Sequence, residues 1–115
     1  LEGTPVTDSV KLNEAKRIAE VSIMPVEVVE DSRCPQDVQC IQAGTVRVRA
    51  SVTARGDAEA QDVMFELGVP MTLGLDQVTL VSVEPAPKAN AQIAPSDYVF
   101  TFTVVKGAGT EFFKG

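Results

Sequence analysis

The chain has 115 residues, 44% of them hydrophobic and 23% charged, which is enough for one hydrophobic core and too little for two. Its formal net charge of -6, with no opposing cluster of Lys or Arg, disfavours binding to nucleic acid and to anionic lipid surfaces. No stretch approaches the roughly 18 consecutive apolar residues that a membrane-spanning helix needs. Composition therefore predicts one globular domain without a transmembrane segment.

Residue types that carry much of enzyme chemistry are missing. The sequence contains no histidine and no tryptophan, and Tyr98 is its only tyrosine. Without an imidazole, the chain lacks the most common general base, the most common metal ligand and any catalytic triad built on histidine. A serine nucleophile would need a lysine as its base, and such a pair cannot be recognised from spacing. We therefore expect a protein that is not an enzyme and that uses no cofactor.

The beginning of the chain has no clear periodicity. Residues 1–8 are mostly polar, and we expect them to form a flexible lead-in. Residues 9–20 fit two interpretations, because Val10 and Ile18 fall on one face of a helix, whereas Val10 and Leu12 alternate as in a strand. We favour two short strands here, because the segments that follow all predict β-structure.

Two predicted strands flank the cysteines. Within residues 21–31 the parity of the apolar side chains changes at Pro25. Proline has no N–H for a strand ladder, so we expect a β-bulge or a bend at Met24 and Pro25. Residues 46–54 alternate strictly between apolar and polar side chains, which is typical of a half-buried antiparallel strand. This second segment is the clearest strand pattern in the sequence.

The second half of the chain predicts four more strands, at residues 63–67, 71–75, 77–84 and 98–105. The apolar parity changes near Leu80, which indicates either another bulge or a strand covered on both faces. A loop rich in proline and alanine, residues 85–91, precedes the last strand. Beyond that strand we expect a flexible tail at residues 107–115, in which Phe112 and Phe113 either dock on the rim or are exposed.

The predicted elements define the fold class. About seven short strands, separated by turn residues and without a sustained amphipathic helix, indicate an all-β protein. We expect a single-domain antiparallel β-sandwich of residues 9–106, with Ig-like or Greek-key connections. A small β-barrel is the alternative.

The two cysteines set the expected compartment. Cys34 and Cys40 are six positions apart, and with no other thiol and no histidine they cannot complete a four-ligand zinc site. A disulfide is the economical interpretation, and closing so short a loop contributes about 2 kcal/mol. Disulfides persist mainly in oxidising compartments, so we expect an exported, periplasmic or extracellular protein. The chain opens at Leu1 rather than methionine, which fits a mature chain whose targeting segment has been removed.

The sequence around the cysteines resembles a known signature. It follows the pattern D-S-R-C-P-x-x-V-x-C-I-W-A-G of small bacterial exported proteins and lipoproteins, with matching residues Asp31 to Pro35, Val38, Cys40, Ile41, Ala43 and Gly44. Two later segments, Val83 to Pro87 and Ile93 to Tyr98, also match, so the likeness covers roughly Val10 to Val105. The resemblance implies a secreted or periplasmic β-rich domain, with a lipid anchor on the full-length precursor as an alternative, and it implies no activity. Gln42 stands where this family commonly has tryptophan.

The cysteine corner also holds the candidate functional residues, which are Asp31, Arg33, Asp37 and Gln42. With Glu30, the two aspartates supply oxygen ligands of the kind that Ca²⁺ prefers, although turn carboxylates more often accept hydrogen bonds from backbone N–H groups. Arg33 has two alternatives: an outward anion-binding fork, or a bridge between loops that donates to carbonyls, which we favour. Redox activity of the cysteines is not favoured, because their spacing is not C-x-x-C.

These observations favour a non-enzymatic exported β-sandwich that acts as an interaction or accessory module at the cell envelope. Its contact surface would combine the cysteine corner with the proline-rich segment from Pro85 to Pro95, because loops on a rigid scaffold are common contact sites. The partner would be an unknown protein or envelope component. The alternative is a small periplasmic metal- or ligand-binding protein that uses the corner of Asp31 and Asp37.

Overall fold

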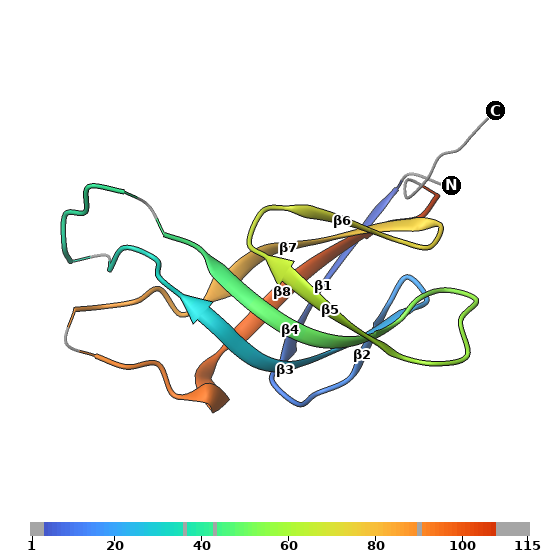
Figure 1. The fold of residues 1–115 in the computed structure, drawn as a ribbon, viewed down its shortest axis with the longest axis horizontal. Coiled ribbons are helices and arrows are strands. Elements are labelled where there is room, and N and C mark those ends of the chain that lie inside the picture. Colours follow the sequence, from blue (N-terminus) through green and yellow to red (C-terminus); the bar gives the residue numbers. More distant parts are fainter. Residues whose placement is uncertain (1–3, 36, 43, 90, 108–115) are drawn as a thin grey trace.

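The computed structural model describes residues 4–35, 37–42, 44–89 and 91–107 and is built from eight β-strands (Figure 1). The strands are β1 (Pro5–Lys11), β2 (Lys16–Ile18), β3 (Val21–Asp31), β4 (Val46–Thr53), β5 (Gln61–Glu66), β6 (Pro70–Leu73), β7 (Asp76–Glu84) and β8 (Val99–Val105), with one 3-10 turn, η1 (Pro95–Asp97). They form two antiparallel four-stranded sheets, in the orders β1-β8-β7-β6 and β2-β3-β4-β5. The two-sheet architecture confirms the predicted all-β sandwich.

The connections differ from those expected. Hydrogen-bonded neighbours are consecutive in the chain, and β1 returns to pair with β8, so the strand order is that of a meander divided between two sheets. Neither an Ig-like nor a Greek-key order occurs among the described strands, because each neighbouring pair other than β1 and β8 is joined by a hairpin. The sheets also do not close into a barrel, because no ladder joins β1 to β2 or β5 to β6.

The beginning of the chain belongs to the sandwich. Strand β1 starts at Pro5 and pairs with β8 along its whole length, from Pro5 opposite Val105 to Lys11 opposite Val99. Residues 5–8, expected in a flexible lead-in, are therefore part of a sheet. Their local sequence gives little sign of this, because Val10 is the only residue of β1 that is fully buried. Lys11 is followed by a turn and by β2, so the expectation of two short strands is confirmed over a helix.

Both predicted irregularities are present. The register of β3 against β4 shifts between Pro25 and Glu27 and again between Val28 and Glu30. The register of β7 against β8 shifts between Leu80 and Ser82. These bulges explain why the apolar side chains change parity along β3 and β7, since an extra residue on one strand turns the following side chains to the other face.

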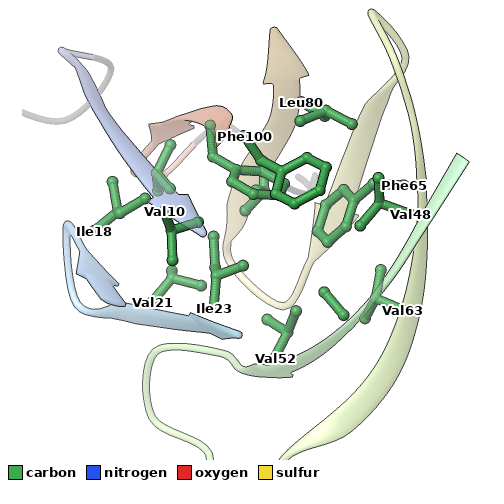
Figure 2. Packing of buried hydrophobic residues seen from close by; sticks show 14 of the residues in the cluster. Val10, Ile18, Val21, Ile23, Val48, Val52, Val63, Phe65, Leu80 and Phe100 are labelled. Carbon is green, nitrogen blue, oxygen red and sulfur yellow. The ribbon is translucent and has the colours of Figure 1, made fainter. Parts of the chain in front are cut away.

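The core lies between the inner faces of the two sheets (Figure 2). Phe65 from one sheet meets Phe102 from the other edge to face, with 5.0 Å between the ring centroids. Valine, isoleucine and leucine side chains fill the space around them, including Val10, Ile18, Val21, Ile23, Val48, Val52, Val63 and Leu80. Leu75, which we expected in a strand, instead lies exposed in the turn between β6 and β7, where Gly74 adopts a φ of 64°. The expected tail residues Phe112 and Phe113 lie outside the described part of the chain.

A buried ion pair closes one end of the sandwich. Asp76, at the start of β7, has no exposed surface, and its carboxylate accepts hydrogen bonds from Arg55 Nη2 at 2.8 Å and Arg55 Nε at 3.1 Å. The backbone N–H of Gly107, just after β8, donates to the same carboxylate at 3.0 Å. Arg55 follows β4, so this one carboxylate links the two sheets. Burial alone would raise the pKa of Asp76, but the hydrogen bonds from Arg55 and Gly107 hold it below its ordinary value.

We predict that Asp76→Asn lowers the free energy of unfolding by about 2–3 kcal/mol at neutral pH, because the amide leaves the Arg55 guanidinium without its anionic partner. Asp57→Asn, an exposed change nearby, should alter the free energy of unfolding by less than about 0.5 kcal/mol. Urea unfolding of the three proteins measures both effects.

The same comparison has a predicted pH dependence. Because the pKa of Asp76 is lower in the folded than in the unfolded chain, its stabilising effect is complete above the unfolded pKa of about 3.9 and disappears as the pH falls through the folded pKa. The difference between wild type and Asp76→Asn should therefore shrink in acid. A difference that stayed constant below that pH would show that the charge of Asp76 is not the source of the stability.

Candidate functional site

The cysteine corner is the connection between β3 and β4, at the end of the sandwich opposite the turn between β6 and β7 (Figure 1). Cys34 and Cys40 are joined by a disulfide, with 5.9 Å between their Cα atoms. Just after this loop, Gly44 lies so close to Ser32 that a β-carbon on it would collide with the Ser32 carbonyl. Ser32 and Thr45 then close the base of the loop, since Ser32 N–H donates to the Thr45 carbonyl at 2.8 Å and Thr45 N–H to Ser32 Oγ at 3.0 Å.

Asp31 and Arg33 form the centre of the site. Arg33 Nε donates to Asp31 Oδ1 and Arg33 Nη2 to Asp31 Oδ2, both at 2.9 Å, which is a two-pronged ion pair. The hydroxyl of Tyr98 donates to Asp31 Oδ2 at 2.8 Å. We call these three residues the Asp31 network. It joins the end of β3 to the residue that precedes β8.

The remaining donors of Arg33 reach a third segment. Arg33 Nη1 donates to the Val83 carbonyl at 2.7 Å, and Arg33 Nη2 to the Pro85 carbonyl at 3.1 Å. Both carbonyls lie where β7 runs into the long loop 85–98. Arg33 therefore bridges two loops through backbone carbonyls, which is the alternative that the sequence favoured over an anion-binding fork.

Asp37 and Gln42 have different surroundings. Asp37 Oδ1 accepts a hydrogen bond from the backbone N–H of Ala89 at 2.9 Å, so the disulfide loop and the loop 85–98 are joined a second time. Gln42 is exposed and lines a separate polar hollow of about 650 Å³ with Glu30, Ser32, Gly44, Thr45 and Glu66. The structure thus brings Asp31, Arg33 and Asp37 to the interface of two loops and gives Gln42 no part in it.

The acidic residues at this corner are already engaged. Both oxygens of Asp31 accept hydrogen bonds from Arg33, and Glu30 accepts from Ser32 Oγ at 2.9 Å. Within residues 4–107, leaving out the three undescribed positions, no group of three or more His, Cys, Asp or Glu side chains is placed to hold a metal ion. The alternative of a metal site built on Asp31 and Asp37 thus has no set of ligands among these residues.

Two hollows lie on either side of the Asp31 network. The first, which we call the β3 groove, has a volume of about 450 Å³ and is lined by Leu12, Asn13, Val26, Glu27, Val28, Val29, Glu30, Asp31, Ile93, Pro95 and Tyr98. The second has about 410 Å³ and is lined by Asp31, Pro87, Ala91, Gln92, Ile93 and Tyr98. The shared wall of Asp31, Ile93 and Tyr98 is therefore the feature that shapes both. Sequence reasoning missed the groove, because its lining comes from three separate parts of the chain.

Electrostatics keep the network in one protonation state. The hydrogen bonds from Arg33 lower the pKa of the Asp31 carboxyl, against a smaller opposing effect of burial, and the Arg33 pKa is raised in turn by Asp31. The pKa of Tyr98 is raised to about 12. Burial is the largest cause of this rise, and the hydrogen bond to Asp31 is the second. At neutral pH the network therefore consists of a carboxylate, a guanidinium and a neutral phenol, with no group poised to exchange a proton.

Comparison with protein-family models, with curated proteins and with solved structures finds no match to the chain. A search of the described residues for a helix long and apolar enough to cross a membrane also finds none.

Tyr98 offers a direct test of the network, because the sequence has no other tyrosine and no tryptophan. We predict that its phenolate absorbance titrates with a midpoint of about 12 in the folded protein and near 10 in denaturant. Because the folded pKa is the higher one, the stability that Tyr98 adds is complete below about pH 10 and is lost as the pH rises through 12. In Asp31→Asn the midpoint should fall only part of the way from about 12 toward 10, since Tyr98 stays buried.

Circular dichroism at each pH is the control for folding in this titration. A midpoint near 10 in the folded wild type would mean that Tyr98 is neither buried nor bonded to Asp31, and would contradict the network.

Proposed function

We propose that this protein is an exported, non-catalytic recognition module of the cell envelope and that it binds a partner protein at its disulfide-bearing end. The observation that carries the proposal is that two long loops at this end are fastened together, and that one of them, the loop 85–98, lines two adjoining hollows. Loops that carry binding function are usually held in place by a rigid scaffold. Here the scaffold is the sandwich, and the fastening comes from Arg33 and Asp37.

The hydrogen bonds between the loops favour a preformed surface. Arg33 donates to the carbonyls of Val83 and Pro85, while Asp37 accepts from Ala89 N–H. The disulfide limits the freedom of the loop that carries Arg33 and Asp37. A surface that is ordered before binding loses less conformational entropy when the partner arrives, which increases affinity.

The chemistry of the corner favours recognition over catalysis. A general base needs an accessible lone pair and a pKa near the working pH. Asp31, the least exposed carboxylate of this corner, instead has a lowered pKa and is saturated by hydrogen bonds from Arg33 and Tyr98. Together with the lack of histidine in the sequence, this supports a binding role.

Two features support the export part of the proposal. A disulfide persists mainly in oxidising compartments, and Cys34 and Cys40 are bonded. The segment around them also resembles the signature of small bacterial exported proteins and lipoproteins, and the resemblance includes Asp31 and Arg33.

Site-specific photo-crosslinking in intact producing cells tests the proposal. A photoreactive residue in place of Ala91, which is exposed beside the second hollow, should give a discrete adduct with an envelope protein. The matched control is Ala58, an exposed alanine in the loop between β4 and β5 at the other end of the sandwich (Figure 1). This position should not give that adduct.

A variant of Arg33 tests whether the fastened loops are needed for the adduct. The adduct formed through position 91 should weaken several-fold in Arg33→Lys, because lysine cannot bridge the two loops with a planar fork. The same adduct from positions 91 and 58, an adduct only with a cytosolic protein, or no adduct from position 91 would contradict a recognition surface at this end.

A further inference from the structure

The edge of β3 that faces away from β4 is open over about half of the strand. Strand β2 pairs with β3 only from Val21 to Ile23, and Asn13 N–H then donates to the Pro25 carbonyl at 2.7 Å. From Val26 to Glu30, no strand of the described chain pairs with this edge, while β4 follows the other edge as far as Asp31. A strand edge with free backbone groups is a template for another strand.

This open edge forms one wall of the β3 groove. Ile93, Pro95 and Tyr98 form the facing wall, and Leu12 and Asn13 also contribute. Val29, on the edge, is 49% exposed although it is a large apolar residue. The groove therefore offers both the backbone groups that pair with an added strand and the apolar surface that holds its side chains, which is the combination used in β-strand addition.

Two of the four outer edge strands are less suited to this role. The edge strands β2 and β6 have only three and four residues, and short edge strands resist pairing with other chains. The carboxylates of β3 also leave its edge open, since Glu27 pairs with Arg49 and Glu30 with Arg47, both on β4. These ion pairs hold both carboxylates against the arginines of β4.

Charge indicates which kind of segment fits. Glu27, Glu30 and Asp31 are among the residues that line the groove, and no lysine or arginine is. The carboxylates are each paired with an arginine, so the preference comes mainly from the whole chain, whose net charge is -6. A field of this sign attracts positively charged partners and disfavours acidic ones.

We propose that an extended, positively charged segment of another protein adds as a strand to the edge of β3 at residues 26–30, with apolar side chains at alternate positions against Val29 and Ile93. This inference rests on the proposed function and names the partner of the same surface. Five residues of pairing span about 17 Å, so a short linear segment is sufficient.

The test uses a short, end-capped synthetic peptide of alternating valine and lysine as the probe, added to the full chain. Amide hydrogen exchange by NMR should show slower exchange within residues 26–30, by about tenfold at saturation, which corresponds to about 1.4 kcal/mol of added protection. A peptide of alternating valine and glutamate tests the charge. A valine–lysine peptide with prolines at alternate positions tests the backbone pairing, because proline cannot donate to a ladder.

Val29→Lys and Val81→Lys are the matched variants. Val29 is 49% exposed on the open edge, and Val81 is 44% exposed on β7 in the other sheet, so both changes add the same charge at similar burial. Thermal unfolding checks that both variants fold. Val29→Lys should weaken binding of the valine–lysine peptide about tenfold, since a charged side chain on a strand edge opposes pairing and a lysine repels the positively charged peptide. Val81→Lys should bind like the wild type.

The inference is overturned if the valine–lysine peptide leaves exchange within residues 26–30 unchanged at millimolar concentration, or if the glutamate or proline peptide protects them equally. Protection that rises with protein concentration in the absence of peptide would assign the edge to a second copy of this chain and would also overturn it. If Val29→Lys keeps the crosslinked adduct formed through position 91 while Arg33→Lys loses it, recognition at this end stands and strand addition fails.

Discussion

The guanidinium group of Arg33 holds together three segments that are far apart in the sequence. It pairs with Asp31 at the end of β3, and it donates to the carbonyls of Val83 and Pro85 at the end of β7. Tyr98 joins the same carboxylate from the start of β8. The disulfide spans only six positions within one loop, so it shapes that loop without fastening it to anything else. The position of the whole disulfide-bearing end therefore depends on Arg33, assisted by Asp37.

The two ends of the sandwich solve the same physical problem in the same way. Between the sheets, apolar side chains supply the stability, but at each end the strands turn and leave polar backbone groups near the core. An aspartate at a strand end meets an arginine from a loop in both places, as Asp31 with Arg33 and Asp76 with Arg55. The pairs differ in what they fasten. Asp76 joins the two sheets, whereas the Asp31 network holds the loop 85–98, which lines the β3 groove, against the end of β3.

Much of the fold could be predicted from local patterns, and the site only in part. Strict alternation located β4, and the parity changes at Pro25 and Leu80 located the bulges, because both signals are carried by neighbouring residues. The start of β1 was missed, because its pairing with β8 joins residues about a hundred positions apart. The sequence favoured Arg33 as a bridge between loops. It could not identify the carbonyls of Val83 and Pro85 as the partners, because every residue has a backbone carbonyl. Asp76 lies between two predicted strands, and only the structure shows that it is buried.

If Arg33 fixes the two loops as one surface, the amide of Ala89 reports on it most directly, because this N–H donates to Asp37 across the loop interface. Native-state hydrogen exchange of that amide in the wild type and in Arg33→Lys is the measurement. The Ala89 amide should be protected in the wild type and should exchange much faster in the variant, while the amide of Phe102 in the core stays protected in both. Equal exchange of the Ala89 amide in the two proteins would contradict the role assigned to Arg33.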